Sequence, residues 1–318
     1  METHMNKHSL FISSFKFLAK LFCLSAILIF LFFIILLPQY SYGYNAGLLD
    51  KMNHLESIEE PKIVLIGNSN LVFGIKSEML EEALGMPVAN MGLHGGLGNI
   101  FHEEMAKINL REGDIIVVAH TAFADNDKLA DPVLTWAAIE NHLKLWQLIR
   151  FKDIPDMYFA FPTYAKKALT RWSTKMGNDE GGTMYARFIF NEYGDASGGN
   201  KCMMKESDFA GKIGIPGIND PCINRLNDLN QYITEHGAIM VVAAYPIAYG
   251  PDTPPAEEWQ AFQAELETRL DCPVISDYTD YFFEYKYFYN SELHLTDDGA
   301  VLRTNQLIDD LERYLQSL

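Results

Sequence analysis

Ser69 is the residue best placed in this sequence to act as a nucleophile. It lies in the stretch KIVLIGNSNLVFGI, where an aliphatic run ends in the polar tetrad Gly-Asn-Ser-Asn. These residues are also the commonest in turns, so the tetrad alone fits an ordinary β-turn. A reactive serine needs a base, donors for an oxyanion and a group that orients the base. The rest of the sequence must therefore supply these three partners.

Candidates for these partners occur later in the chain. His294, in the segment NSELHLTDDGA just before the last predicted helix, is the candidate base. The amide of Ser69 and the glycine-rich turn with Gly92, Gly95 and Gly96 are candidate oxyanion donors, because glycine lets the backbone approach a ligand closely. A single histidine before a helix is also a common structural feature, so the hypothesis depends on all these residues together.

Alternating strands and helices would bring these residues together. Apolar runs predict buried strands, and amphipathic segments with capping residues predict the helices between them. Because the strands are apolar throughout, we expect an α/β fold with a parallel sheet and helices on both faces. The expected strands are residues 62–67, 87–92, 114–120, 157–162, 238–246 and 273–278, and the expected helices are residues 78–84, 100–110, 132–146, 222–236, 256–270 and 297–318.

Polar residues follow the ends of several of these strands. In a parallel sheet, ligands bind at the carboxyl ends of the strands, near the point where the strand order reverses. Ser69 follows the first strand, His120 and Thr121 follow the third, and Tyr245 ends a later one. We therefore expect these side chains, with the loop at residues 90–96, to surround one cleft.

Three sequence blocks resemble the SGNH/GDSL hydrolase superfamily. They are Ser69, the segment Asn90-Met-Gly-Leu-His-Gly95, and His294-Leu-Thr followed by Gly299. The resemblance implies a three-layer α/β/α flavodoxin-like fold and acyl-ester chemistry without a metal or cofactor. It also implies that Ser69 is the nucleophile, that His294 is the base, and that the amides of Ser69 and Gly95 form the oxyanion hole.

The sequence departs from the family pattern in three places. Asn68 stands where the family has an aspartate before the serine, and residues 120–123 lack the asparagine of the third block. Ser291 stands where an aspartate should orient His294, and Asn290 precedes it. Changing aspartate to asparagine in a catalytic triad lowers kcat by about 10⁴-fold. We therefore expect another polar or acidic group at the far nitrogen of His294, or a weak hydrolase.

Five further residues near these blocks are candidates for lining the cleft or orienting the catalytic groups. They lie at or just after predicted strand ends, where a ligand would bind. A buried structural role fits the two histidines among them equally well. The five residues are Asn70, Asn90, His94, His120 and Tyr245.

Residues 17–37 predict a single membrane-spanning helix. The run LFCLSAILIFLFFIILL is uncharged, and Phe17 to Lys20 extend it to the ~20 residues that a span needs. Lysines before the run predict a cytoplasmic tail at residues 1–16 and a body outside the cell membrane. A cleaved signal peptide is the alternative, because Ser41 and Gly43 form a weak small-x-small pattern.

The charge of the chain restricts its partners. The formal net charge is −17, and residues 1–44 hold three lysines and one glutamate, which leaves −19 on the rest. Because phosphates would be repelled, a nucleic-acid partner is excluded. The expected partners are the lipid bilayer, a glycan or acylated cell-envelope polymer, and a membrane-bound acyltransferase.

We expect the body to consist of a linker and one large domain. Residues 38–60 are mostly polar and predict a linker, and residues 61–318 predict the SGNH-like domain. Residues 151–220 interrupt the alternation with many glycines and aromatic residues. This insertion is either a lid or partner surface, or an elaboration without a role.

The spacing of the cysteines does not predict a metal site. Cys202, Cys222 and Cys272 lie in the predicted outer body, where a disulfide is chemically permitted, and Cys23 lies in the span. A Cys202–Cys222 pair is conceivable because both lie in one loop-rich region. No pair has the spacing of a zinc site.

Two functions from different classes follow from these expectations. The first is a serine-dependent esterase or O-acyltransferase that acts on a cell-envelope glycan, similar to the DltD-like membrane-anchored acyl-transfer proteins. The second is a non-catalytic module of the same fold that binds a glycan or scaffolds a membrane acyltransferase. The missing aspartates favour the second, and the order of the three blocks favours the first.

Overall fold

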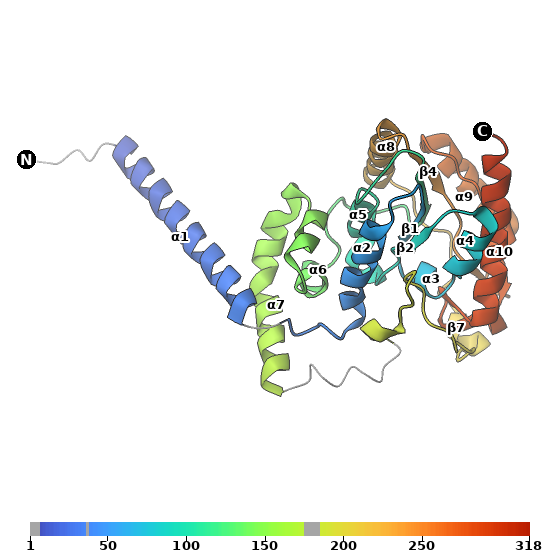
Figure 1. Cartoon of the computed structure of the whole chain (residues 1–318), viewed down its shortest axis with the longest axis horizontal. Coiled ribbons are helices and arrows are strands. Elements are labelled where there is room, and N and C mark those ends of the chain that lie inside the picture. The colour runs from blue at the N-terminus through green and yellow to red at the C-terminus, as the bar shows by residue number, and fades with distance from the viewer. Residues whose placement is uncertain (1–6, 36–37, 175–184) are drawn as a thin grey trace, which may run out of the picture. The chain divides into compact units, whose positions relative to one another are not determined.

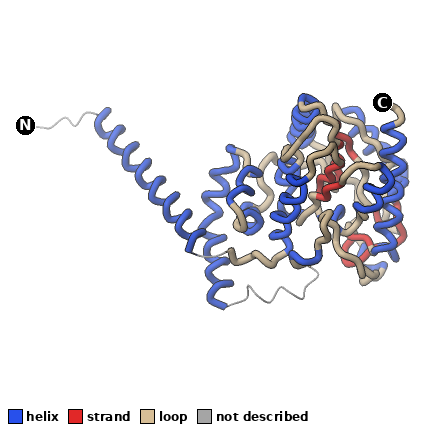
Figure 2. Tube along the Cα trace, in the orientation of Figure 1, coloured by secondary structure: helices blue, strands red, loops and turns tan. Residues whose placement is uncertain are grey.

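The computed structural model describes residues 7–35, 38–174 and 185–318 of the chain. The chain divides into two compact units, Met1–Gln39 and Tyr40–Leu318. Figure 1 traces the elements of both units, and Figure 2 shows that the body combines short strands with many helices. The chain is therefore a mixed α/β protein with a separate N-terminal segment.

The first unit consists of one apolar helix, α1 (Lys7–Ile35). Within it, Ile12–Phe32 is long and apolar enough to cross a membrane, judged by length and composition. A signal sequence has the same character. The helix begins well before the predicted span, so part of the predicted tail is helical, and residues 36 and 37 lie outside the described residues.

A four-stranded parallel sheet forms the centre of the body. Its order is β2-β1-β3-β4, with Ile63 of β1 opposite Val88 of β2 and Ile115 of β3. Nearly every strand residue is buried, which explains why the sequence shows continuous apolar runs. All four strands of this sheet were predicted, within the segments 62–67, 87–92, 114–120 and 238–246. Their bounds are β1 (Ile63–Gly67), β2 (Val88–Asn90), β3 (Ile115–Ala119) and β4 (Ile239–Val242).

Helices pack against this sheet. Alternate strand residues such as Leu65 and Val117 form one buried cluster with Leu80 of α4 and with Leu307 and Leu311 of α10. In Figure 1, α4 and α10 lie on one side of the strands and α5 on the other. The helices of the body are α2 (Gly47–Ser57), α3 (Ser69–Val72), α4 (Ser77–Leu84), α5 (Gly98–Met105), α6 (Pro132–Ile139), α7 (Ile154–Thr174), α8 (Asp220–Glu235), α9 (Ala256–Arg269) and α10 (Asp297–Leu315).

The predicted helix ends are mostly confirmed by their caps. Thr296 accepts a hydrogen bond from the amide of Gly299 at the start of α10, and Asp131 caps α6 through its carboxylate. Gly85 ends α4 with φ 66°, a left-handed conformation that glycine adopts without strain. The helix predicted at 132–146 extends too far. Helix α6 ends at Ile139, and a separate 3-10 helix (Leu143–Leu148) follows it.

Two small sheets flank the main one. Strands β5 (Ile247–Tyr249) and β6 (Phe282–Glu284) pair in parallel. Strands β7 (Phe288–Ser291) and β8 (His294–Leu295) form an antiparallel hairpin directly before α10. The predicted strand at 273–278 contributes only a single bridge, from Val274 to Val242.

The strand predicted at residues 157–162 is wrong, because this segment lies inside α7. The segment MYFAFP is apolar throughout, as a buried strand would be. Over a longer window, however, Met157, Tyr164 and Ala168 recur at helical spacing, and all three are buried. The indole of Trp136 in α6 donates to the carbonyl of Met157 at 2.7 Å, which fixes the two helices together. The insertion expected at 151–220 therefore begins with a regular helix.

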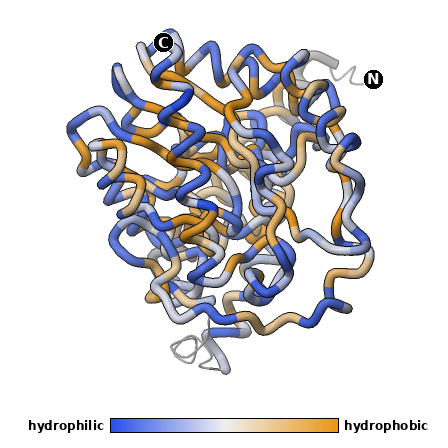
Figure 3. The backbone as a smooth tube through the Cα atoms, turned by 90° about the vertical axis from the view of Figure 1, so that its right-hand side faces the viewer, coloured by the Kyte–Doolittle hydropathy of each residue, from blue (hydrophilic) through white to orange (hydrophobic). Residues whose placement is uncertain are grey.

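The segment expected as a linker is folded from Tyr40 onward. Leu48, Met52 and Leu55 of α2 are fully buried, since they share one face of an amphipathic helix. Helix α2 contacts β2, so this segment belongs to the core of the body. In Figure 3 the hydrophobic segments of the chain run through the middle of the body, and hydrophilic turns lie outside them.

Candidate active site

Ser69 lies where β1 turns into the short helix α3. The side chain of Asn68 holds this turn: its Oδ1 accepts from the amide of Asn70 at 2.9 Å, and its Nδ2 donates to Thr121 Oγ1 at 2.8 Å. Ser69 is half-buried at the carboxyl end of the sheet. The polar tetrad thus forms a rigid turn that presents a serine.

The imidazole of His294 lies within hydrogen-bond distance of this serine. Its Nε2 is 2.8 Å from Ser69 Oγ, although 225 positions separate the two residues. His294 is carried by the β7–β8 hairpin, in which it pairs with Ser291. The expected contact between Ser69 and His294 is present, and its geometry suits proton transfer from the hydroxyl to the ring.

Asn290 contacts the far nitrogen of His294. Its Oδ1 lies 2.7 Å from His294 Nδ1, and its Nδ2 donates to the hydroxyl of Tyr185 at 2.9 Å. With its amide oriented in this way, Asn290 Oδ1 accepts a hydrogen bond from the Nδ1–H group of His294. The other ring nitrogen, Nε2, then carries no proton and faces Ser69 as an acceptor. A polar group was expected at this nitrogen, and it comes from a position one residue before the family's usual one.

The side chain of His294 is buried among aromatic residues. The ring centre of Phe73 lies 4.4 Å from that of the imidazole, and Tyr185 lies 6.4 Å away. Burial, with a smaller contribution from nearby His94, lowers the pKa of His294 to about 4. The imidazole is therefore neutral, as a proton acceptor must be, throughout the neutral range.

The two candidate oxyanion donors belong to neighbouring residues of the site. Gly95 lies against Asn68: a Cβ added to it would be 3.6 Å from the Asn68 Cβ. Ser69 opens α3, where the first amides have no partner within the helix. His94 is exposed and accepts the amide of Gly96 on its Nδ1 at 2.9 Å, which shapes the turn.

Asn70 is a buried structural residue. Arg303 of α10 donates to its carbonyl at 2.7 Å and to its side-chain oxygen at 2.8 Å. Arg303 is itself buried, and this burial lowers its pKa to about 10. The residue after the nucleophile is therefore clamped by the C-terminal helix. No local sequence signal predicts this contact, because it joins residues 233 positions apart.

Two other candidates, Asn90 and His120, are buried and make hydrogen bonds to acidic residues outside the Ser69–His294–Asn290 group. Asn90 is fully buried and donates to Asp195 at 2.8 Å, so it supports the loop of the insertion. His120 is buried, and its Nε2 lies 3.1 Å from a carboxylate oxygen of Glu103. Burial raises the pKa of Glu103, but hydrogen bonds and ion pairing with His120 and Arg225 outweigh this effect and hold it below its usual range.

The side chain of Ser291 takes no part in orienting the His294 ring, although the two residues are paired in the hairpin. Its hydroxyl accepts the amide of Leu293 at 3.2 Å and so stabilises the hairpin turn. Glu284, an acidic residue close to His294 in the sequence, pairs with Lys286 instead. The position that holds an aspartate in the family is therefore used here to form a turn.

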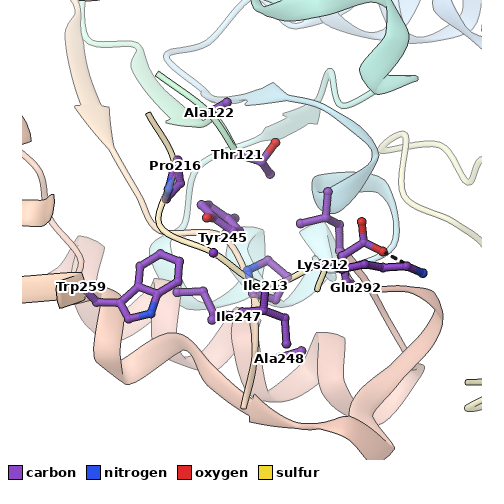
Figure 4. Close-up of a pocket in the computed structure, with 13 residues that line it drawn as sticks. Thr121, Ala122, Lys212, Ile213, Pro216, Tyr245, Ile247, Ala248, Trp259 and Glu292 are labelled. Carbon is purple, nitrogen blue, oxygen red and sulfur yellow. Dashed lines mark ion pairs between the residues drawn. The ribbon is translucent and has the colours of Figure 1, made fainter. Parts of the chain in front are cut away.

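Tyr245 lines a cavity of about 210 Å³. Figure 4 shows its aromatic and aliphatic walls, with Trp259 and Ile247 among them, and the ion pair of Lys212 with Glu292 at its rim, 3.9 Å long. Thr121, which accepts the hydrogen bond from Asn68, also lines it. The remaining lining residues are Ala122, Ile213, Gly214, Pro216, Pro246, Ala248 and Leu293.

Three aromatic residues of the site were not predicted. Phe73 and Tyr185 contact His294 or its partner, and Tyr44 stacks parallel to Phe73 with ring centres 6.4 Å apart. Tyr44 belongs to the segment expected as a linker, and Tyr185 to the expected insertion. The density of aromatic residues in the insertion is the one sequence signal that points to this role.

The described residues contain no group of three or more histidine, cysteine, aspartate or glutamate side chains that could hold a metal ion. The four cysteines are free; Cys222 and Cys272 are buried, whereas Cys202 is exposed. A Cys202–Cys222 disulfide, which the sequence left open, is thus not formed in this structure.

Comparison with known proteins adds no family assignment. No protein-family model matches the chain, and neither the curated proteins nor the solved structures gave a match.

Proposed function

We propose that the chain is a membrane-anchored, serine-dependent esterase or O-acyltransferase of SGNH type. The observation that carries the proposal is the relay from Ser69 through His294 to Asn290, with contacts of 2.8 and 2.7 Å. Nucleophile, base and orienting group lie in the order that acyl-serine chemistry requires. The strand order 2-1-3-4 agrees with a flavodoxin-like three-layer fold, in which ligands bind at this edge of the sheet.

The mechanism begins with attack of Ser69 Oγ on an ester carbonyl carbon, while His294 Nε2 takes the hydroxyl proton. The amides of Ser69 and Gly95 stabilise the oxyanion. When the tetrahedral intermediate breaks down, the ester C–O bond is cleaved and His294 returns the proton to the leaving oxygen. A second hydroxyl then attacks the carbonyl carbon of the acyl-serine and gives its proton to His294. As the acyl C–Oγ bond breaks, His294 passes this proton to Ser69 Oγ, which restores the free serine and the neutral imidazole.

The second hydroxyl decides between hydrolysis and transfer. Water as the acceptor makes an esterase, whereas a sugar hydroxyl makes an O-acyltransferase. Asn290 orients the imidazole but supplies no negative charge, so activation of water is weak. A sugar held next to the acyl-serine gains from proximity and competes well. This reasoning favours transfer to a cell-envelope glycan.

The cavity lined by Tyr245 is our candidate acyl site, because its lining includes Thr121, which binds Asn68, and Leu293, the neighbour of His294. Its volume of about 210 Å³ exceeds the ~150 Å³ of a cavity that binds benzene and falls below the ~300 Å³ of a small drug site. Walls such as Ile247, Tyr245 and Trp259 suit an apolar chain. We therefore propose a short acyl group, such as acetyl or butyryl, rather than a long fatty acid.

The test combines covalent labelling with an ester series. A fluorophosphonate probe should label the full chain in detergent, and peptide mapping should place the adduct on Ser69. Hydrolysis of p-nitrophenyl acetate and butyrate should exceed that of the octanoate by at least tenfold, because the longer chain does not fit the cavity.

Ser69→Ala should abolish both labelling and hydrolysis, and Ser291→Ala, which removes a nearby hydroxyl that bonds the amide of Leu293, should retain them. A folded wild-type chain that is neither labelled nor active would contradict the proposal and leave the non-catalytic module. Equal rates with all three esters would contradict the assignment of the acyl cavity alone.

A further inference from the structure

Helix α7 carries two apolar stripes, although packing in the body uses only one. The first stripe contains Met157, Tyr164 and Ala168, which are buried against the rest of the body. The second stripe follows the same helical spacing on another side of the helix. It consists of Ile154, Tyr158, Pro162, Ala165, Leu169 and Trp172, and is called the α7 stripe below.

The larger side chains of the α7 stripe are exposed. Trp172 is 61% exposed, Leu169 45% and Ile154 40%, and Phe159 at the edge of the stripe is 76% exposed. Phe151, in the turn before the helix, is 89% exposed. Single exposed apolar residues are ordinary, but a periodic row of them along a helix of 21 residues marks an interaction surface.

The charges next to the stripe identify the kind of surface that it contacts. Lys166 is exposed on α7 beside the stripe, Lys167 is exposed on the opposite side of the helix, and Lys152, before the helix, pairs with Asp127. These cations stand out in a chain whose net charge is −17. A helix with tryptophan and leucine on one side and lysines beside them is typical of helices that lie in the membrane interface, where lysines meet lipid phosphates.

We propose that α7 is an interfacial membrane helix. Its stripe inserts between lipid headgroups and acyl chains, and Lys166 beside the stripe contacts lipid phosphates. The inference rests on the membrane anchor included in the proposed function, but it does not depend on the catalytic role of Ser69. The occupant of the stripe is thus the lipid surface rather than a protein.

Trp172 gives a direct test, because it is the exposed tryptophan of the described residues. Trp136 and Trp259 are buried, and Trp146 is partly covered. The full chain is reconstituted into vesicles of phosphatidylcholine brominated on its acyl chains, mixed with phosphatidylglycerol. Bromine quenches only tryptophans that reach the acyl region, so part of the emission should be lost. Trp172→Phe should remove most of this quenching.

A matched pair of variants tests the stripe itself. Leu169→Glu places a charge in the stripe and should reduce the quenching of Trp172 at least twofold. Leu302→Glu, at a position of α10 that is 43% exposed, should leave the quenching unchanged.

Two results would overturn the proposal. One is unquenched Trp172 in a chain that floats with the vesicles, which would mean that the stripe faces water or a protein partner. The other is a chain that does not float with vesicles at all, which would also remove the anchor from the proposed function. Flotation thus separates failure of the anchor from failure of the helix, and probe labelling of Ser69 reports on catalysis separately.

Discussion

At the scale of single residues, Asn290 determines how strong a base His294 can be. It fixes the ring through Nδ1, and Tyr185 fixes its amide in turn. An asparagine in this place also occurs in papain-like proteases, whose thiol nucleophile needs less activation than a hydroxyl. Here it serves a serine, and burial further lowers the basicity of the ring. The site therefore has the geometry of a triad without the charge that stabilises an imidazolium.

Asn290→Asp should strengthen the base. A carboxylate at this position stabilises the protonated ring, so the pKa of His294 should rise from its value of about 4. The rate of acetate ester hydrolysis should increase at least tenfold, since the reverse change in a protease triad costs about 10⁴-fold. The acid limb of the pH profile of kcat/KM should lie near pH 4 in the wild type and at least one pH unit higher in the variant.

Ser291→Asp is the matched control, because it places the carboxylate at the family's usual position. Here that side chain faces the amide of Leu293 rather than His294, so we expect no comparable gain. If Ser291→Asp gains activity and Asn290→Asp does not, the contact between Asn290 and His294 is not the one that operates during catalysis.

The residues of the site differ in how far sequence alone could predict them. Ser69 and His294 stand next to local signals, namely a strand end and a helix start, and the structure brings them together. Arg303 and Tyr185 have no such signal, because each acts through a contact with a residue far away in the sequence. Asn290 could be named as a candidate but not chosen over Ser291, since the choice depends on the register of a hairpin.

At the scale of elements, α2 is the helix whose contribution sequence reasoning misjudged most. Its polar residues suggested a linker, but one of them, Lys51, is buried with its Nζ 2.7 Å from the carbonyl of Asn90. The ammonium also contacts the ring of Phe190, 4.5 Å from its centre. A lysine can thus serve the core when carbonyl oxygens and an aromatic face replace water.

This buried lysine predicts how stability depends on pH. Burial, only partly opposed by nearby Asp195, lowers the pKa of Lys51 to about 7. Between pH 7 and the unfolded value of 10.5, the unfolded state binds more protons, so the free energy of unfolding rises with pH across this window. The gain should be on the order of a few kcal/mol and should be absent in Lys51→Met.

Thermal unfolding of the full chain in detergent at several pH values measures this effect. Lys201→Met is the control, because Lys201 is exposed and its removal should leave the slope unchanged. If the stability of the wild type and of Lys51→Met changes with pH in the same way, the ammonium of Lys51 is not desolvated in the folded state.

Short apolar segments mark the limit of element prediction. The strands of the main sheet could be predicted because they are buried on both faces and are apolar throughout. Residues 157–162 looked like a strand for the same reason, but they belong to a helix with an apolar residue on almost every side. A helix that faces both a protein core and a second apolar surface loses the simple 3.6-residue signal. The misassignment and the α7 stripe thus have one physical cause.

At the scale of the whole molecule, the charges of the basic N-terminus and the acidic body predict how the chain is oriented in the membrane. The structure supplies a helix long and apolar enough to span it, and the charges around this helix predict a direction of insertion. Lys7, Lys16 and Lys20 precede or begin the apolar run, which favours an N-terminus in the cytoplasm. An envelope glycan as the substrate requires this orientation, because the site must lie outside.

Cys202 makes this orientation measurable without an engineered tag. It is exposed, whereas Cys222 and Cys272 are buried, and burial raises the pKa of both buried thiols to about 12. Since Cys23 lies within the candidate span, a membrane-impermeant maleimide should react with Cys202 alone when added to intact cells whose outer face is accessible. Cys202→Ser should remove the label. Reaction only after lysis would place the body inside the membrane and would rule out an external glycan as the substrate of Ser69.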